Sequence, residues 1–172
     1  GHYLGGDRTR DGRDLDVALP PDANLIEEMK ADLVSLFSGR QLRESGYYTS
    51  DQLRSLYASG IYRTLQNNRP PRDQPYQTMQ LMQFNWFLDK GVLRFDPASG
   101  RLSIDYDRYP QAVEGLLKEV LAIQDAGDPA RSDAFVKRWT NWDEALHGRI
   151  AQPMRETQRY RYRLFTYGAM GE

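Results

Sequence analysis

The chain has 172 residues, the size of one ordinary domain, and is long enough to bury about 70% of its unfolded surface. A composition of 40% hydrophobic and 27% charged residues is typical of a globular rather than a disordered protein. The net charge of −1 excludes capture of nucleic acid or an anionic membrane by the charge of the whole chain. The absence of cysteine excludes disulfides, thiolate metal sites and a cysteine nucleophile. The apolar stretches are too short to span a bilayer, so we expect a soluble protein, cytoplasmic or periplasmic, with no membrane partner.

Residues 1–20 are rich in glycine and charge, and we expect them to form an exposed, extended lead-in to a helical domain at 21–150. Apolar residues recur at helical spacing over 25–39, which predicts the first helix of that domain. The sequence TSDQ at 49–52 has the pattern of a capping box and predicts the start of the second helix. That helix ends before the Pro-Pro pair at 70–71.

The next predicted helix, at 76–90, is apolar nearly all round and should therefore lie at the centre of the core. The hydrophobic period then changes, and two short apolar segments around a Pro/Ser/Gly turn predict a β-hairpin at about 92–106. Two further helices are expected at 109–126 and 129–139. The Gly-Asp-Pro sequence at 127–129 separates them, with the aspartate as N-cap and the proline in the first turn.

A short helix is expected at 143–150, and an Arg/Tyr-rich tail at 151–172 completes the chain. Arginine and tyrosine alternate in the tail from Arg159 to Arg163, as in a strand. The predicted fold class is mainly α: a helical array with one small β-hairpin and an irregular or strand-like C-terminal tail.

Familiar catalytic patterns are missing from the sequence. Neither histidine accompanies a serine in a G-x-S-x-G elbow, which argues against a serine hydrolase. Neither G-x-x-x-x-G-K-[ST] nor G-x-G-x-x-G occurs, so the glycine-rich loops that hold nucleotide phosphates are absent.

Three carboxylates on the first predicted helix are the main candidates for chemistry. Glu28 and Asp32 are four residues apart and share a helix face, whereas Glu27 points about 100° away. Two desolvated carboxylates one turn apart repel each other unless a metal ion or a basic partner lies between them. The alternative is a solvated acidic face, which suits the positive end of the helix dipole.

The two histidines have competing interpretations. His2 follows Gly1, and a Gly-His start is either a remnant of tag cleavage or part of a functional motif. His147 precedes a glycine at a predicted helix end, where we expect a capping or surface role. The basic and aromatic residues of the tail suit either single-stranded nucleic acid or an edge strand or wrapping tail, and we favour the second and expect no nucleic-acid partner.

The sequence EEMKAD at 27–32 resembles the second zinc motif, E-E-x-x-A-[ED], of the dipeptidyl peptidase III family of zinc metallopeptidases. The resemblance covers about residues 25–139. It includes the helix followed by a glycine and a hairpin from Gln77 onward, and the helix break QDAGD at 124–128. The first motif of that family is His-Glu-x-x-Gly-His, of which this chain has only the last two residues, Gly1 and His2.

The resemblance implies that Glu28 and His2 are zinc ligands and that Glu27 and Asp32 are carboxylates that orient the ligands. It also implies that the first histidine and the general base, Glu, are missing, so no catalytic residue lies in this chain. A catalytic zinc has at least three protein ligands, so we expect the chain to be inactive alone.

The resulting hypothesis is a fragment, the C-terminal part of the catalytic lobe, of a zinc peptidase that releases N-terminal dipeptides. Its partners would be the peptide substrate and the upstream half of the same protein, or a second copy in a homodimer. The alternative is a non-catalytic helical module that binds a protein partner through its tail and exposed aromatic residues.

Overall fold

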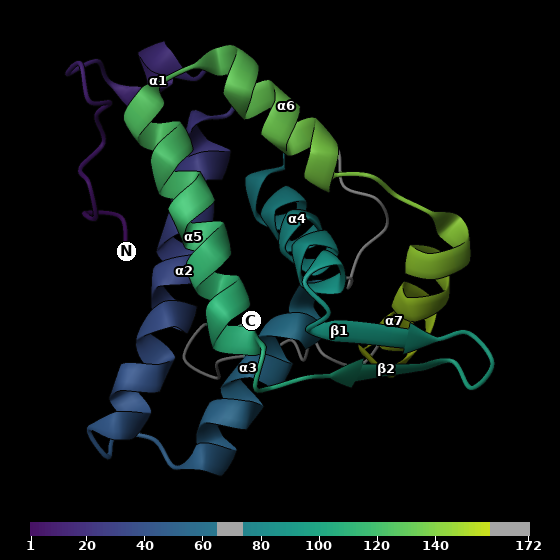
Figure 1. The fold of residues 1–172 in the computed structure, drawn as a ribbon. Coiled ribbons are helices and arrows are strands. Elements are labelled where there is room, and N and C mark those ends of the chain that lie inside the picture. Colours follow the sequence, from purple (N-terminus) through teal and green to yellow (C-terminus); the bar gives the residue numbers. More distant parts are fainter. Residues whose placement is uncertain (65–73, 159–172) are drawn as a thin grey trace, which may run out of the picture.

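A computed structural model of the chain describes residues 1–64 and 74–158 (Figure 1). The described part consists of helices, one π-helical turn and one two-stranded hairpin, so the predicted fold class is confirmed. The elements in chain order are α1 (Leu15–Ala18), α2 (Ala23–Glu44), α3 (Ser50–Thr64), α4 (Pro75–Asp89), β1 (Leu93–Asp96), β2 (Arg101–Ile104), α5 (Tyr109–Ala126), α6 (Pro129–Trp139), η1 (Glu144–Gly148) and α7 (Arg149–Gln158).

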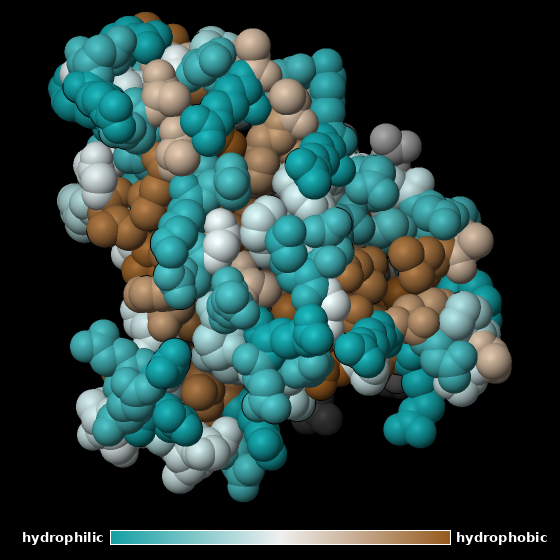
Figure 2. All heavy atoms as spheres, viewed as in Figure 1, coloured by the Kyte–Doolittle hydropathy of each residue, from teal (hydrophilic) through white to brown (hydrophobic). Residues whose placement is uncertain are grey.

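The two longest helices, α2 and α5, run antiparallel and form the most extensive helix–helix contact of the described residues (Figure 1). Helix α4 packs against α2, α3, α5 and α6, and it is buried at most positions, as its apolar sequence predicts. Side chains from α2, α4 and α5 fill the core, among them Met29, Leu33, Phe84, Phe87, Leu116 and Val120. Hydrophilic residues cover most of the face in Figure 2, with hydrophobic residues in separate groups between them.

Local sequence signals fix several helix ends. Thr49 and Gln52 form a reciprocal capping box: the Gln52 side chain accepts from the Thr49 N–H at 2.8 Å, and the Thr49 hydroxyl accepts from the Gln52 N–H at 3.2 Å. Asp128 caps α6 by accepting from the Ala130 N–H at 2.9 Å. Gly127 ends α5 with φ at +57°, a conformation that favours glycine. These ends agree with the predicted 109–126 and 129–139 helices.

The hairpin lies within the predicted 92–106 segment. Leu93 pairs with Ile104 and Asp96 pairs with Arg101 in an antiparallel register. Gly100, with φ at +67°, provides the left-handed residue of the turn. Helix α4 contacts β1, so the hairpin extends from the end of the central helix.

Residues 1–14 are exposed apart from Thr9, and the chain enters the core at Leu15. Leu15, the first residue of the single helical turn α1, and Leu19, directly after it, are both buried. Their apolar side chains pack into the core, whereas the charged residues of this segment face solvent. At the other end, η1 leads directly into α7, which continues past Pro153 to Gln158 and buries Ile150. The alternation at Arg159 to Arg163 lies outside the described residues.

Within residues 1–64 and 74–158, no helix has both the length and the apolar character needed to cross a membrane.

Candidate functional site

The acidic residues of α2 lie near the start of that helix, where Glu27, Glu28 and Asp32 are all half-buried. The start of α2 is anchored by a buried contact, because the Ser132 hydroxyl on α6 donates to the Asp22 carboxylate at 2.8 Å. The carboxylates of this acidic face therefore project from a helix whose position is fixed by the core and by α6.

Residues Gly1 and His2 lie against this part of α2. A Cβ atom built on Gly1 would stand 2.5 Å from the Cα of Ala31 and 2.8 Å from its carbonyl oxygen. Only glycine allows so close an approach to a helix backbone. This packing places the His2 ring beside the acidic face, where its Nδ1 lies 3.1 Å from Oε1 of Glu27.

The His2–Glu27 pair has the geometry of a carboxylate that orients a histidine. With the proton on Nδ1, the imidazole donates to Glu27 and keeps the lone pair of Nε2 available for another partner. Metal-binding histidines are commonly held in this way by a carboxylate on the second ring nitrogen. The His2 side chain is 50% exposed, so an ion can approach it from solvent.

Glu28 and Asp32 both reach helix α4, as expected for residues that share one face of α2. The Tyr76 hydroxyl donates to Oε1 of Glu28 at 2.8 Å, and the Gln83 amide donates to Oδ2 of Asp32 at 2.8 Å. The bond to Glu28 favours the protonated phenol and raises the pKa of Tyr76. Among the described residues, no hydrogen bond or ion pair joins His2 to Glu28.

A buried lysine, Lys30, lies next to this acidic face. Its ammonium donates to the carbonyl of Gly6 at 3.3 Å, and the amide of Gln124 on α5 donates to the same carbonyl at 2.6 Å. Burial lowers the pKa of Lys30, while the charges of Glu27 and Asp7 act in the opposite direction. The N-terminal segment is thus tied to α2 and α5 at one point.

Sequence reasoning missed Tyr76, Gln83 and Lys30. A weak signal existed for Gln83, because it interrupts the apolar run of α4 and a buried amide needs a partner. A similar signal existed for Lys30, which follows Met29 on the side of α2 that faces the core. Nothing in the sequence indicated that Tyr76 would meet Glu28, because that contact depends on how α2 and α4 pack.

His147 is buried, so the surface role expected for it is wrong, and its side chain bonds the start of η1 rather than capping a helix end. Its Nδ1 accepts from the Asp143 N–H at 2.9 Å, at the start of η1. Its Nε2 donates to the Asn85 side-chain oxygen at 2.6 Å, and the Asn85 amide donates to the Trp139 carbonyl at 2.8 Å. The ring also stacks on Trp142. These contacts hold a neutral imidazole, and burial lowers the pKa of His147.

The described residues do not form a complete zinc site. No group of three or more His, Asp or Glu side chains among them is arranged to hold a metal ion. His2 and Glu28 offer at most two ligands, whereas a catalytic zinc has three from the protein. The fit is therefore partial: His2 of the N-terminal segment is held by Glu27, and Glu28, the next residue of α2, is held by Tyr76.

No protein-family model matches the chain. A curated protein with a similar sequence is Nudix hydrolase 3 of Arabidopsis thaliana, which is 32% identical over 114 residues. The match spans 66% of this chain and 15% of that protein.

Two solved structures that resemble the chain are dipeptidyl peptidase III enzymes. The enzyme from Caldithrix abyssi matches with a TM-score of 0.71 and 24% identity over 90% of this chain. The enzyme from Corallococcus sp. strain EGB matches with a TM-score of 0.70 and 20% identity over 88% of this chain. The chain has the fold of part of dipeptidyl peptidase III. It spans 29% and 28% of the two enzymes, respectively.

Proposed function

We propose that this chain is the C-terminal part of the catalytic lobe of a zinc peptidase that resembles dipeptidyl peptidase III and releases N-terminal dipeptides. Helix α2 and the N-terminal segment contribute Glu28 and His2 as two zinc ligands, and Glu27 and Asp32 orient the site. The single observation that carries the proposal is the His2–Glu27 contact at 3.1 Å within this fold, made by the residue that precedes Glu28 on α2.

The packing of Gly1 supports a functional role for His2 over a remnant of tag cleavage. A remnant has no physical reason to fit against Ala31 so closely that a Cβ would overlap the helix backbone. A Gly-His pair that belongs to a zinc motif needs such an approach, because the histidine must reach the carboxylates of α2.

The contacts of Glu28 also suit a metal ligand. Its Oε1 accepts from Tyr76, which fixes the carboxylate while leaving Oε2 to another partner. Asp32, one turn further, is fixed in the same way by Gln83. Hydrogen bonds of this kind orient ligating carboxylates in metal sites.

The missing ligand and the general base would come from residues outside this chain. The chain spans less than a third of the matched dipeptidyl peptidase III enzymes, so the remaining part of the same protein is the partner we propose, together with a peptide substrate. A homodimer is the alternative partner. The match covers only 15% of the Arabidopsis relative, which is too little to carry its hydrolase activity over to this chain.

Zinc titration of the isolated chain tests the ligand assignment. We expect weak binding that falls about tenfold or more in both His2→Ala and Glu28→Gln, and by a similar factor in Glu27→Gln. Glu44→Gln, at the far end of the same helix, is the matched control and should bind as the wild type does. Equal binding by all four variants would contradict the assignment.

An extension of the chain tests the proposed completion of the site. A variant with His-Glu-Ala-Ala joined before Gly1 should bind zinc more tightly than one with Ala-Glu-Ala-Ala, because a third ligand is added. The gain should disappear in the Glu28→Gln background. If the two extensions bind zinc equally, His2 and Glu28 do not belong to a site of this kind.

A further inference from the structure

We propose that the groove between α5, α6 and the end of α4 is a docking site for an acidic peptide segment of a partner protein, with apolar side chains between its carboxylates. The proposal goes beyond the peptidase function and is independent of it, since no residue that lines the groove belongs to α2.

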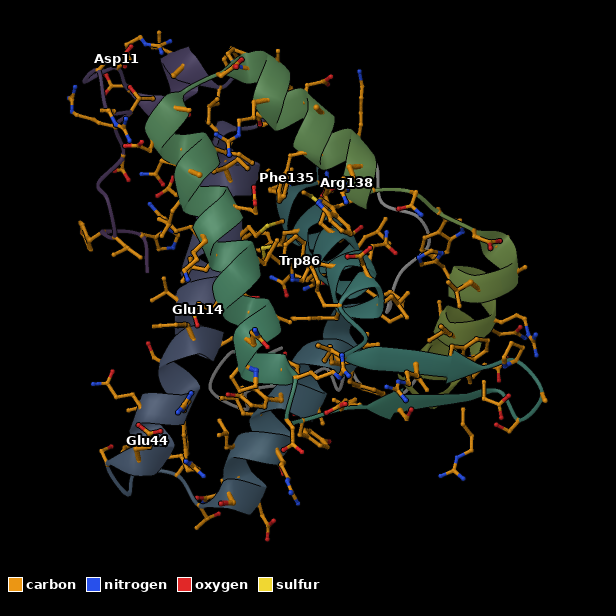
Figure 3. All side chains as sticks on the ribbon, in the orientation of Figure 1. Asp11, Glu44, Trp86, Glu114, Phe135 and Arg138 are labelled. Atoms are coloured by element: carbon orange, nitrogen blue, oxygen red, sulfur yellow. The ribbon has the colours of Figure 1, made fainter. Side chains whose placement is uncertain are left out.

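Two tryptophans form the floor of the groove. Trp86 of α4 and Trp139 of α6 meet edge to face, with ring centroids 5.0 Å apart. The Trp86 N–H donates to the Ala112 carbonyl at 2.8 Å, so its polar atom is already satisfied and the ring offers only carbon to a ligand. In Figure 3, Trp86 lies beside Phe135 and Arg138 of α6, where that helix passes α4.

Two hollows open on this floor, and Trp86 and Lys90 line both of them. The hollow toward the start of α5 has a volume of about 360 Å³, and the one toward α6 about 320 Å³. Gly115 keeps the first hollow open, because a Cβ at that position would stand 3.2 Å from the Trp86 ring. Two hollows on either side of a lysine suit two apolar side chains that flank a carboxylate.

The charges along the groove are unbalanced. Its lining contains the cations Lys90, Arg108, Arg131 and Arg138 and a single carboxylate, Glu119. The chain as a whole has a net charge of −1, so this excess is local. A groove with an excess of positive charge attracts an acidic ligand and selects against a basic one.

Two of these cations lie over the tryptophan floor. The Lys90 ammonium stands 4.6 Å from the Trp86 ring and the Arg138 guanidinium 4.8 Å from the Trp139 ring. Arg138 has no ion pair with a carboxylate in residues 1–64 and 74–158, and Arg131 approaches Glu119 only at 3.8 Å. Arg138 and Arg131 can therefore bind ligand carboxylates at a small cost in existing ion pairs.

A peptide suits this groove better than a nucleic acid does. Lys90 pairs with Asp89 at 2.9 Å, and Arg108 pairs with Asp105 at 3.1 Å. Together with Glu119 these carboxylates interrupt the positive surface and would repel a continuous phosphate backbone. An extended peptide can place carboxylates at the separated cations and apolar side chains in the hollows.

Selection from a library of random linear peptides tests the proposal with the intact chain. We expect enriched peptides to be acidic and to contain apolar residues, and to bind the Arg138→Glu variant at least about tenfold more weakly. Tryptophan fluorescence during titration reports binding at the floor of the groove. Lys118→Glu, an exposed charge reversal on α5 outside the groove, is the matched control and should bind as the wild type does.

A second variant tests the contribution of the first hollow to peptide binding without changing a charge. Gly115→Leu fills the first hollow and should weaken the same peptides, while circular dichroism reports whether the helices are retained. Should it fail to fold, Lys90→Glu and Arg138→Glu still test the groove. The proposal is overturned by an absence of enriched peptides, by enrichment without acidic residues, by equal binding to Arg138→Glu, or by tighter binding of a single-stranded oligonucleotide.

Discussion

Tyr76, in the first turn of α4, donates a hydrogen bond of 2.8 Å to Glu28 on α2. The contact joins residues 48 positions apart and links the acidic face of α2 to the central helix of the core. It gives the half-buried Glu28 carboxylate a fixed orientation near the surface, where Tyr76 is 55% exposed.

Replacing Tyr76 by phenylalanine removes this hydrogen bond and keeps the ring. If Glu28 is a metal ligand, zinc affinity should fall about tenfold, because the carboxylate loses the group that orients it. The midpoint of thermal unfolding should change little, since the bond lies at the surface. Zinc titration and a thermal melt measure the two effects. The control is Tyr47→Phe, an exposed tyrosine in the α2–α3 connection; an equal loss of affinity there would argue against an orienting role for Tyr76.

Replacing Gly1 by alanine introduces a Cβ that overlaps the backbone of Ala31. The N-terminal segment must then move away from α2, and His2 should lose its contact with Glu27. We expect zinc binding to fall as far as it does in His2→Ala. Tyr3→Ala, which changes a side chain that is 96% exposed, should leave binding intact. Wild-type zinc binding by Gly1→Ala would show that His2 is not held by this packing.

The buried His147 should make stability depend on pH. Its pKa is lowered from 6.5 in the folded state, so the unfolded chain binds a proton first as the pH falls. Its contribution is therefore fully present above about pH 6.5 and is lost progressively as the pH falls toward the lower, folded-state pKa.

Urea unfolding between about pH 5 and pH 8 measures the effect of His147, because this range excludes most carboxylate titration. The free energy of unfolding of the wild type should decrease below about pH 6.5, and His147→Gln should flatten that decrease. Val17→Ala, which changes an exposed side chain without charge, is the control and should keep the slope of the wild type. The same slope in His147→Gln as in the wild type would rule out His147 as its source.

Position 127 needs glycine for two reasons, its positive φ and its close contact with Thr9, and Gly46 shares only the first of them. It has φ at +57°, and a Cβ there would overlap Thr9 of the N-terminal segment. Gly46 has φ at +80° and no neighbouring atom within 4 Å of its would-be Cβ. Gly46→Ala should therefore cost about 1 kcal/mol of unfolding free energy for backbone strain alone. Gly127→Ala should cost about 2–4 kcal/mol, because overpacking is added. Chemical denaturation measures both, and equal losses would contradict the Thr9 contact.

Much of the fold could be predicted because the sequence marks its helix ends with specific residues. The Thr49–Gln52 capping box and the glycine and aspartate at 127–128 act locally, within one turn, so their structural effect does not depend on distant parts of the chain. The helix at 76–90 was placed at the centre correctly, because an apolar surface on every side has to be buried.

The details of the candidate site depend on long-range packing, which periodicity does not report. Tyr76 and Gln83 reach the α2 carboxylates only because α4 crosses that helix. His147 was expected to be a cap at the surface because nothing in the neighbouring sequence indicates that it is buried. Its burial depends on a contact with Asn85, which is 62 positions away. The continuation of α7 past Pro153 was also missed, because a proline inside a helix removes one backbone hydrogen bond and usually kinks or breaks the helix.

The carbonyl of Gly6, held by Lys30 from one helix and by Gln124 from another, has a practical consequence for handling the protein. Together with the packing of Gly1 on Ala31, it holds the N-terminal segment against α2, so a polypeptide fused to Gly1 starts beside the acidic face. A bulky affinity tag or fluorophore at that end, unlike a four-residue extension, would crowd the acidic face. Probes for surface immobilisation are better attached to exposed side chains of α5, such as Lys118, on which the zinc titrations proposed above do not depend.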